Sequence, residues 1–239
     1  MRLTVCLPTY NERENLEPML RALGEALPED SRVLVIDDAS PDGTGELADA
    51  LAADFDYVGV LHRPRKEGLG PAYLDGFRRA LGDGAELVLE MDCDLSHDPR
   101  DVARLLEAVE AGADLALGSR YAPSGSIPNW GPLRRAVSRA GNTYAQVLLG
   151  LPYRDLTGGF KCYTRRVLEA IDLDSISSLG YAFQIETTYR AHRAGFRIVE
   201  VPITFVERQI GSSKMSRAIV AEAAWKVPAL RLAALRRRI

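Results

Sequence analysis

The stretch LVLEMDCDLSHDP, residues 87–99, begins as an apolar run and ends in acids, with Asp92 and Asp94 two positions apart. At the end of a strand, residues i and i+2 point to the same side, so both carboxylates can face one ligand. Their repulsion raises at least one pKa unless a cation lies between them. The pair therefore suits a divalent ion such as Mg²⁺, which combines one or two carboxylates with water and phosphate oxygens. A pair of solvated loop acids is the alternative interpretation.

A second apolar run, RVLVIDD, also ends in acids. Because Asp37 and Asp38 are consecutive, only one of them faces a pocket from a regular strand, and we expect it to be Asp38. The following DDASPDGTGELAD supplies turn residues before a helix N-terminus, which can donate backbone N–H groups to an anion. Ser96 and His97, just beyond the first acid pair, either reach the metal or the sugar or serve only their loop.

The elements that must position these acids alternate along the chain. Runs that predict strands buried on both faces occur at residues 3–8, 32–38, 57–63, 86–92 and 114–120. Segments with apolar residues at helical spacing lie between them. This order predicts an α/β fold with a mainly parallel central sheet, flanked by helices and joined by right-handed crossovers. Ligands of such sheets bind beyond the carboxyl ends of the strands, where both acid pairs are found.

Composition limits the class of protein. The chain has 239 residues, 46% of them hydrophobic and 26% charged, which suits one globular domain with at most a short extension. Cys6, Cys93 and Cys162 follow no metal-ligand spacing, so we interpret them as free thiols in a reducing compartment. The N-terminus lacks a secretion signal, and no run of about 18 apolar residues occurs. We therefore expect a cytoplasmic protein without a membrane span.

Basic residues are concentrated in two blocks, although the formal net charge is only −3. Residues 119–154 contain five arginines and no acid, and residues 208–239 contain eight basic residues against Glu222 alone. This distribution indicates a local anionic partner rather than general affinity for nucleic acid. Solvated helix faces are the alternative explanation for both blocks.

Nine motifs, taken in order and spacing, resemble the polyprenyl-phosphate (dolichyl-phosphate) mannose synthases. They are LPTYNERENL, VIDDASPDGTGELAD, HRPRKEGLGPAYLDGF, EMDCDLSHDP, LGSRY, NWGPLRRAVSRAGNTYAQVLLG, RDLTGGFKCYTRRVLEAI, GYAFQIE and VEVPITFVERQIGSSKMS. PTYNE and D-x-D are shared by many inverting family-2 nucleotide-sugar glycosyltransferases, whereas DLTGGF and ERQIGSSKMS together narrow the resemblance to the polyprenyl-phosphate branch. The resemblance implies the nucleotide-diphospho-sugar transferase (GT-A) fold, with amphipathic helices at the C-terminus.

The resemblance assigns a donor site. The PTYNE turn would hold the nucleoside of GDP-mannose through Pro8, Tyr10 and Glu12, with Asp38 beside the base or ribose. The diphosphate would be lined by Asp92, Cys93 and Asp94, of which Asp92 and Asp94 would hold Mg²⁺ or Mn²⁺. Cys93 stands where the motif commonly has alanine, which is a small-for-small change. Within ERQIGSSK, Arg208 and Lys214 would close over the diphosphate.

The resemblance also implies a lipid monophosphate as the acceptor. Such a phosphate has its second pKa near about 6 and arrives mostly as the dianion, so no general base is needed. The protein must instead hold two anions close together, which arginines and a metal ion can do. Arg120, at a strand end, and Arg134, at the start of the next helix, occupy the positions where the family contacts the acceptor phosphate. Arg135 is the substitute candidate.

The predicted activity is transfer of mannose from GDP-mannose to a polyprenyl or dolichyl phosphate with inversion, with Asp94, Arg120 and Arg134 as the catalytic residues. Three alternatives are open. The first is the same reaction with glucose or another nucleotide sugar, and the second is a catalytically silent scaffold that binds a nucleotide sugar. The third is a sugar-1-phosphate nucleotidyltransferase, which is disfavoured because PTYNE stands where a glycine-rich phosphate loop would be expected.

The predicted organisation is a glycosyltransferase domain over residues 1–215 followed by an extension over residues 216–239. This extension is amphipathic and basic, which suits a peripheral contact with the cytoplasmic face of a membrane. Pro228 is expected to kink or split its helix. The alternative is a terminal helix packed on the core, and a separate membrane-anchoring protein is a further candidate partner.

Overall fold

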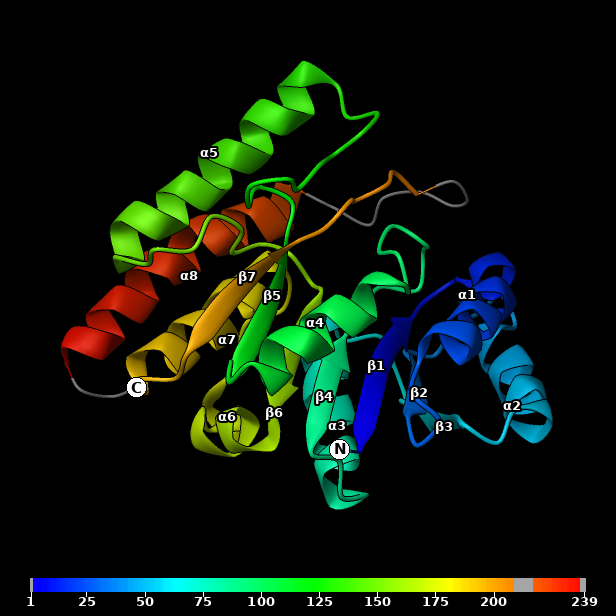
Figure 1. The fold of residues 1–239 in the computed structure, drawn as a ribbon. Helices are drawn as coiled ribbons and strands as arrows, with labels where there is room; N and C mark the ends of the chain where they lie inside the picture. The colour runs from blue at the N-terminus through cyan, green and yellow to red at the C-terminus, as the bar shows by residue number, and fades with distance from the viewer. Residues whose placement is uncertain (1, 209–216, 237–239) are drawn as a thin grey trace.

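A central β-sheet with helices on both faces organises the computed structural model, which describes residues 2–208 and 217–236 (Figure 1). Within these residues the sheet has seven strands in the order β3-β2-β1-β4-β6-β5-β7. The strands are β1 (Leu3–Thr9), β2 (Arg32–Asp37), β3 (Val58–His62), β4 (Leu87–Glu90), β5 (Leu115–Ser119), β6 (Lys161–Thr164) and β7 (Ile198–Pro202). All five strands predicted in the first half of the chain are confirmed within a few residues.

The pairing of the strands is mainly parallel, as predicted. β1 pairs in parallel with β2 and β4, β2 with β3, and β5 with β7. β6 lies between β4 and β5 and is antiparallel to both. The parallel strands β1, β2 and β4 therefore place their carboxyl ends at one edge of the sheet, which is where Asp38 and Asp92 follow.

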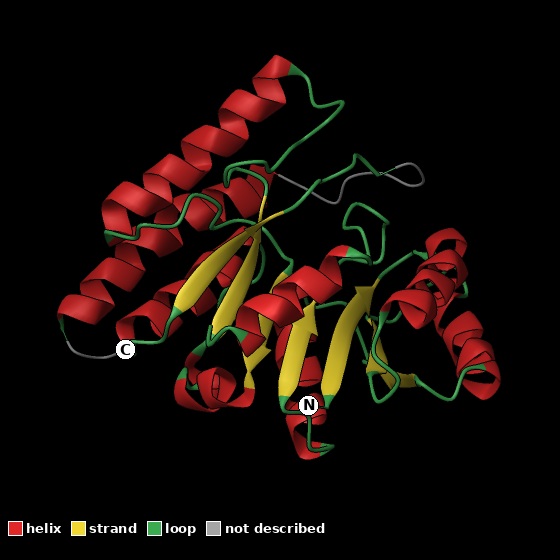
Figure 2. Ribbon diagram, in the orientation of Figure 1, coloured by secondary structure: helices red, strands yellow, loops and turns green. Residues whose placement is uncertain are grey.

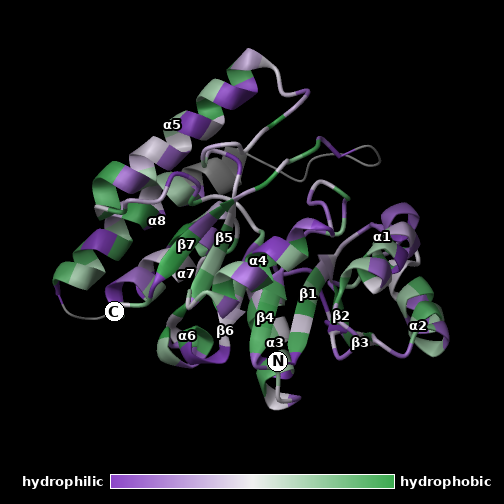
Figure 3. Cartoon of the chain, in the orientation of Figure 1, coloured by the Kyte–Doolittle hydropathy of each residue, from purple (hydrophilic) through white to green (hydrophobic). Residues whose placement is uncertain are grey.

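The helices cover the sheet because its strands are apolar on both sides, as Figure 3 shows. Along β1, Val5 and Leu7 lie in one buried cluster and Cys6 in the cluster on the opposite face. Figure 2 shows the helices around the strands. They are α1 (Arg13–Ala26), α2 (Thr44–Asp54), α3 (Leu69–Gly82), α4 (Asp101–Glu110), α5 (Pro132–Leu149), α6 (Arg165–Ala170), α7 (Tyr181–Arg193) and α8 (Arg217–Leu235), with a short 3₁₀ turn at Leu173–Ser175. All three cysteines are buried and free.

The C-terminal segment forms the helix α8, and Pro228, which was expected to kink or split it, does not split it. A proline inside a helix leaves the carbonyl four residues earlier without its N–H donor. Here that carbonyl belongs to Ala224, and it accepts a hydrogen bond of 2.8 Å from the hydroxyl of Tyr144 on α5. The neighbouring helix therefore replaces the missing donor, which explains why the helix continues.

α8 also contributes to a third buried cluster. Val227, Leu230 and Ala234 pack there with residues of α5 and α7 such as Leu149 and Ile185. The same helix exposes Trp225, Leu232 and Leu235. α8 is thus packed on the core while keeping apolar side chains at the surface. The predicted division into residues 1–215 and 216–239 stays a prediction, because residues 209–216 lie outside the described part of the chain.

We expect Tyr144→Phe to lower the free energy of unfolding by about 0.5–1.5 kcal/mol, because it removes one hydrogen bond and keeps the ring. In a Pro228→Ala background the loss should be smaller, since residue 228 then has its own N–H for the carbonyl of Ala224. Urea denaturation of the four proteins of this cycle measures both values. An equal loss in the two backgrounds would contradict the explanation.

Candidate active site

A cavity of about 420 Å³ lies beyond the carboxyl ends of β1, β2 and β4. It is lined by eight of the predicted donor-site residues, namely Pro8, Tyr10, Glu12, Asp38, Asp92, Cys93, Asp94 and Arg208. These residues come from four separate stretches of the chain. The structure thus brings the predicted donor site together, although the roles of the residues remain predictions. Lys214 lies outside the described residues.

Asp94 is fixed by its own loop and by one cation. The backbone N–H and the hydroxyl of Ser96 donate to its Oδ1, at 3.1 Å and 2.5 Å. Arg208 forms an ion pair with Oδ2 of Asp94, and its other nitrogen Nη1 lies 3.9 Å from Oε1 of Glu12. Leu95 adopts a positive φ of 59°, which turns the backbone between the acid and the serine. Ser96 therefore supports the carboxylate of Asp94.

The two acids carry more negative charge than their surroundings neutralise. Partial burial, together with the charge of Asp94, raises the pKa of Asp92 to about 7. Burial alone would also raise the pKa of Asp94, but the hydrogen bonds from Ser96 and the charge of Arg208 lower it. In the described part of the chain, no group of three or more His, Cys, Asp or Glu side chains could hold a metal ion. The pair thus suits a divalent ion that takes its remaining ligands from a substrate or water.

In this structure the side chain of His97 stabilises its own loop and does not point to a role in binding the metal ion or the sugar. Its ring is buried, stacks on Phe160 with 4.9 Å between the centroids, and meets Phe205 edge-on at 5.3 Å. Its Nδ1 accepts the backbone N–H of Asp92 at 3.3 Å. Burial lowers the pKa of His97 to about 4, so the ring is neutral at pH 7. A neutral acceptor at this position holds the Asp92 backbone in place.

Asp38 lines the cavity, as predicted, but it is also engaged in a buried ion pair. Arg63 contacts Asp38 and, through its other nitrogens, Asp75 at 2.8 Å and Glu67 at 2.9 Å. Burial raises the pKa of Asp38 despite the attraction of Arg63. Asp37 is directed elsewhere, because Ser40 and Thr9 hydrogen-bond its carboxylate. Asp38 is thus held firmly at the cavity wall.

Two further segments, residues 66–69 and 179–181, complete the lining of the cavity. The motifs in the sequence did not assign a role to either segment. Lys66 places its ammonium 3.6 Å from the centre of the Tyr10 ring. The backbone N–H of Gly70 donates to the carbonyl of Leu179 at 2.8 Å, which joins the two loops. A Cβ at Gly70 would lie 2.1 Å from the carbonyl oxygen of Ser178, so only glycine permits this approach. Gly70, the second glycine of KEGLG, was the sequence signal for this contact.

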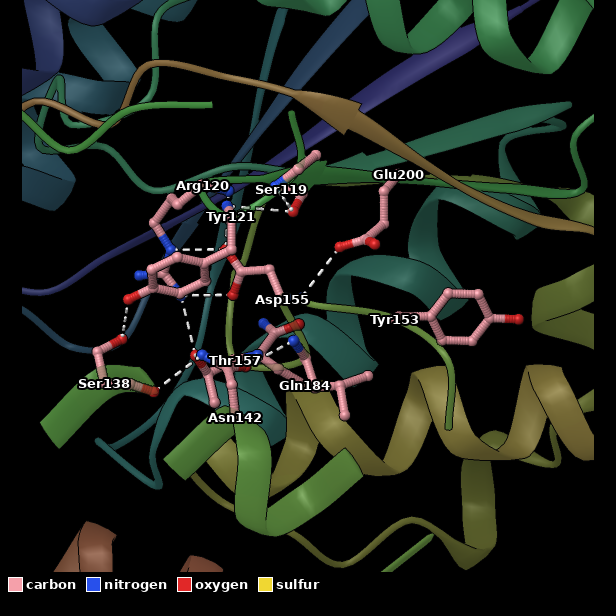
Figure 4. Close-up of polar contacts among 12 residues, drawn as sticks. Ser119, Arg120, Tyr121, Ser138, Asn142, Tyr153, Asp155, Thr157, Gln184 and Glu200 are labelled. Atoms are coloured by element: carbon pink, nitrogen blue, oxygen red, sulfur yellow. Dashed lines mark hydrogen bonds and ion pairs between the residues drawn. The ribbon is translucent and has the colours of Figure 1, made fainter. Parts of the chain in front are cut away.

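Arg120 is held rigidly at the end of β5, as Figure 4 shows. Its Nε and Nη2 donate to the two carboxylate oxygens of Asp155, each at 2.7 Å, and Nη2 also donates to Thr157 at 2.9 Å. Asn142 of α5 donates to the same threonine hydroxyl, and Glu200 accepts the backbone N–H of Asp155. Burial would lower the pKa of Arg120, but Asp155 raises it, so the guanidinium stays charged. One edge of Arg120 is therefore fixed by a paired acid.

Arg134 and Arg120 both approach the ring of Trp130. The guanidinium carbon of Arg134 lies 4.1 Å from the centre of the Trp130 ring, and that of Arg120 lies 5.7 Å from it. Arg134 also forms an ion pair with Glu207, the neighbour of Arg208. The structure thus brings the two predicted acceptor arginines to one ring. Arg135 donates to the carbonyl of Ile127 at 2.8 Å and, together with Arg120, lines a second cavity.

Similarity to known proteins shows the family to which this chain belongs. The glycosyl transferase family 2 model matches residues 4–172, and the chain belongs to this family. It is 53% identical to the polyprenol monophosphomannose synthase of Mycolicibacterium smegmatis over 95% of this chain and 85% of that protein. It is also 53% identical to the undecaprenyl-phosphate mannosyltransferase of Micrococcus luteus, over 98% of this chain and 96% of that protein.

Solved structures confirm the predicted GT-A fold. Glucosyl-3-phosphoglycerate synthase from Mycobacterium tuberculosis, in complex with phosphoglyceric acid, matches with a TM-score of 0.72 at 18% identity, covering 95% of this chain and 80% of that one. A mannosyltransferase from Pyrobaculum calidifontis, in complex with GDP-Man and Mn²⁺, matches with a TM-score of 0.62 at 18% identity, covering 99% and 74%. At these identities the likeness concerns the fold.

We expect the stability of the protein to fall between pH 6.5 and pH 4 partly because of His97. The unfolded chain protonates this histidine near pH 6.5 and the folded protein only near pH 4, so the unfolded state binds more protons in that window. The loss should reach up to about 3 kcal/mol at pH 4. Urea denaturation across this range should show a shallower decline for His97→Phe, which keeps the stacking. Parallel pH curves for the two proteins would refute the assignment.

Proposed function

We propose that this protein transfers mannose from GDP-mannose to a polyprenyl or dolichyl phosphate, with inversion at the anomeric carbon. The observation that carries the proposal is the cavity with two acids, Asp92 and Asp94, close to two arginines that meet at Trp130. A donor diphosphate suits the first group and an acceptor phosphate suits the second. The names of the two relatives at 53% identity support the same sugar and the same class of acceptor.

On the donor side, Pro8, Tyr10, Glu12 and Asp38 would surround the nucleoside. Asp92 and Asp94 would hold Mg²⁺ or Mn²⁺, with Cys93 between them. When bound, this ion would neutralise the developing charge of the leaving GDP. Arg208, which already reaches Asp94, and Lys214 would add positive charge at the diphosphate. The Mn²⁺ in the Pyrobaculum calidifontis complex supports a divalent ion in this fold.

On the acceptor side, the reaction needs positioning rather than a base. An oxygen of the phosphate dianion attacks the anomeric carbon from the face opposite GDP, the bond from that carbon to the diphosphate breaks, and the mannose is left joined to the lipid phosphate. No proton is transferred, since the dianion is already present at neutral pH. Arg120 and Arg134 would offset the repulsion between the two anions and hold the acceptor in line. The rigid pairing of Arg120 with Asp155 supports this role.

A second candidate keeps the reaction and changes the sugar. The structural relatives include a synthase crystallised with UDP-glucose, so the same fold accepts another donor. A panel of GDP-mannose, UDP-glucose and other nucleotide sugars with one polyprenyl phosphate tests both candidates. Radioactivity that becomes soluble in organic solvent only with GDP-mannose and lipid phosphate together supports the proposal. Transfer from UDP-glucose alone would replace it.

The acceptor requires contact with a membrane. No helix among the described residues has the length and apolar character to cross one. Apolar side chains are nevertheless exposed on two helices that pack together, Leu133, Val137 and Val147 on α5 and Trp225, Leu232 and Leu235 on α8. Arg231 and Arg236 lie beside them on the exposed surface of the C-terminal segment. This combination supports peripheral binding to the cytoplasmic face of a membrane, with or without a separate anchoring protein.

We expect Asp94→Ala to lower kcat/KM by roughly 100-fold or more and to weaken GDP-mannose binding mainly when Mg²⁺ or Mn²⁺ is present, because the diphosphate loses its counter-ion. Transfer assays and calorimetry with and without the ion measure both effects. Asp98→Asn is the matched control, since Asp98 is bound by Arg100 and does not line the cavity. Near-normal turnover of Asp94→Ala would refute the metal assignment.

Arg134→Ala should raise KM for the lipid phosphate by at least tenfold and leave KM for GDP-mannose nearly unchanged. The physical reason is the loss of a charge-assisted contact of about 1.5–3 kcal/mol on the acceptor side only. Arg104→Ala on α4 is the control and should leave both constants nearly unchanged, because Arg104 pairs with Asp101 and lines neither cavity. If the two substrates are affected equally, Arg134 does not belong to the acceptor site.

Membrane binding should depend on the exposed side chains of α8. Because this helix also buries Val227 and Leu230, substitution is a cleaner test than truncation. Trp225→Glu with Leu232→Glu should reduce co-sedimentation with anionic vesicles while the unfolding midpoint stays the same. Wild-type binding should also decrease at high salt, since each basic residue near an anionic surface contributes about 1 kcal/mol. Unchanged binding of the double variant would exclude this surface.

A further inference from the structure

Trp130 carries a hydrogen-bond donor that has no acceptor. Its side chain is 8% exposed, and Nε1 finds no partner in the described part of the chain. A buried N–H group without an acceptor is costly, and native structures contain few of them. The indole N–H is therefore a donor for which the described residues supply no acceptor, and a bound ligand could supply one. The position of this ring in the loop before α5 shows what that partner must be.

The groups around the ring are donors and apolar surfaces. Arg134 and Arg120 both approach it, with guanidinium carbons 4.1 Å and 5.7 Å from its centre. Phe205 meets it edge-on, with 5.6 Å between the centroids. A guanidinium has no acceptor atom, so neither arginine can satisfy the indole N–H. A ligand that binds the indole N–H and both guanidinium groups must carry several acceptor oxygens and negative charge, as a phosphate monoester does.

The two arginines differ in how firmly they are held. Asp155 and Thr157 fix the Nε and Nη2 edge of Arg120. Arg134 is 40% exposed and its partner Glu207 is 44% exposed, so that ion pair is weak and opens easily. Arg134 can therefore move to admit a phosphate beside the ring, while Arg120 stays in place.

This position adjoins the donor cavity, because Arg134 pairs with Glu207 and the next residue, Arg208, lines that cavity. Tyr181 lines the cavity beside Asp92 and Arg208. Burial raises the pKa of Tyr181, and the charges of Arg120, Asp92 and Arg134 also act on this hydroxyl. The same tyrosine is therefore within electrostatic reach of both substrate regions.

We infer that Trp130 binds the acceptor, with its indole N–H donating to an oxygen of the phosphate monoester that Arg120 and Arg134 neutralise. The inference rests on the proposed function for the identity of the acceptor, and it adds a third donor to the acceptor site. A neutral donor at this point adds a contact to the phosphate without adding charge.

Intrinsic fluorescence tests the contact without measuring transfer. The chain has two tryptophans, so Trp225→Phe leaves Trp130 as the single reporter. Geranyl phosphate should change the emission of this variant saturably, in the presence of GDP and Mg²⁺, and inorganic phosphate should do so at higher concentration. Geraniol, which has the same chain without the phosphate, should have no effect. An equal response to geraniol, or no response to geranyl phosphate, would overturn the inference.

Kinetics test the N–H itself. Trp130→Phe keeps an aromatic ring beside the two arginines and removes the donor. KM for the lipid phosphate should rise roughly tenfold, while kcat and KM for GDP-mannose stay within about twofold. Trp130→His, which can supply a ring N–H, should restore part of the loss. Phe205→Leu is the matched control: it disturbs the ring cluster without removing a donor and should change acceptor KM by less than about threefold.

The outcomes separate a binding role from a structural one. A structural tryptophan would lower the unfolding midpoint in Trp130→Phe and affect both substrates equally, which would overturn the inference. An acceptor KM that Phe205→Leu raises as much as Trp130→Phe would do the same. If the wild-type protein transfers no mannose to lipid phosphate, the proposed function fails, yet the fluorescence response to geranyl phosphate still reports on Trp130.

Discussion

Repulsion between Asp92 and Asp94 is the constraint on which the site depends. Both acids follow β4 within a parallel sheet, and neither can move away because the surrounding backbone is tied to His97 and Ser96. Their charge is partly offset by Arg208, which comes from the far end of the described domain. The loops that surround the cavity therefore converge on an excess of negative charge, and that excess creates the need for a cation.

On the acceptor side, the structure must stabilise positive charge rather than negative charge. Arg120 is buried, which would be costly for an isolated charge, and Asp155 offsets that cost. Arg134 is more exposed and paired with Glu207, so it remains movable. One arginine thus provides a fixed reference point and the other an adaptable contact. A site that must admit a phosphate attached to a long lipid gains from both properties.

Much of the fold followed from the sequence because its signals were local. The five strands of the first half were predictable, since each is a short β-branched run buried on both faces. The grouping of Pro8, Asp38 and Asp94 followed as well, because the carboxyl ends of parallel strands meet at one edge. The antiparallel β6 was not predicted as such, because a strand of four residues carries no mark of its direction.

The features that could not be predicted from the sequence are contacts between distant residues. Nothing in the local sequence shows that Arg63 pairs with Asp38, that Asp155 holds Arg120, or that two arginines approach the ring of Trp130. The expectation that Pro228 would kink or split the last helix used a sound local rule, and its failure to split the helix has a cause 84 residues away, in the hydroxyl of Tyr144. The local rule states that proline lacks an N–H donor, whereas the packing of the neighbouring helix decides whether another group replaces that donor.

The hydrogen bond from the hydroxyl of Tyr144 also makes α8 dependent on α5. A helix interior without proline can supply the N–H partner of each of its carbonyls from its own backbone. α8 cannot, because one of its carbonyls is completed by a side chain of α5. The two helices are therefore one structural unit, and transplanting either into another glycosyltransferase would require carrying the tyrosine and the proline together.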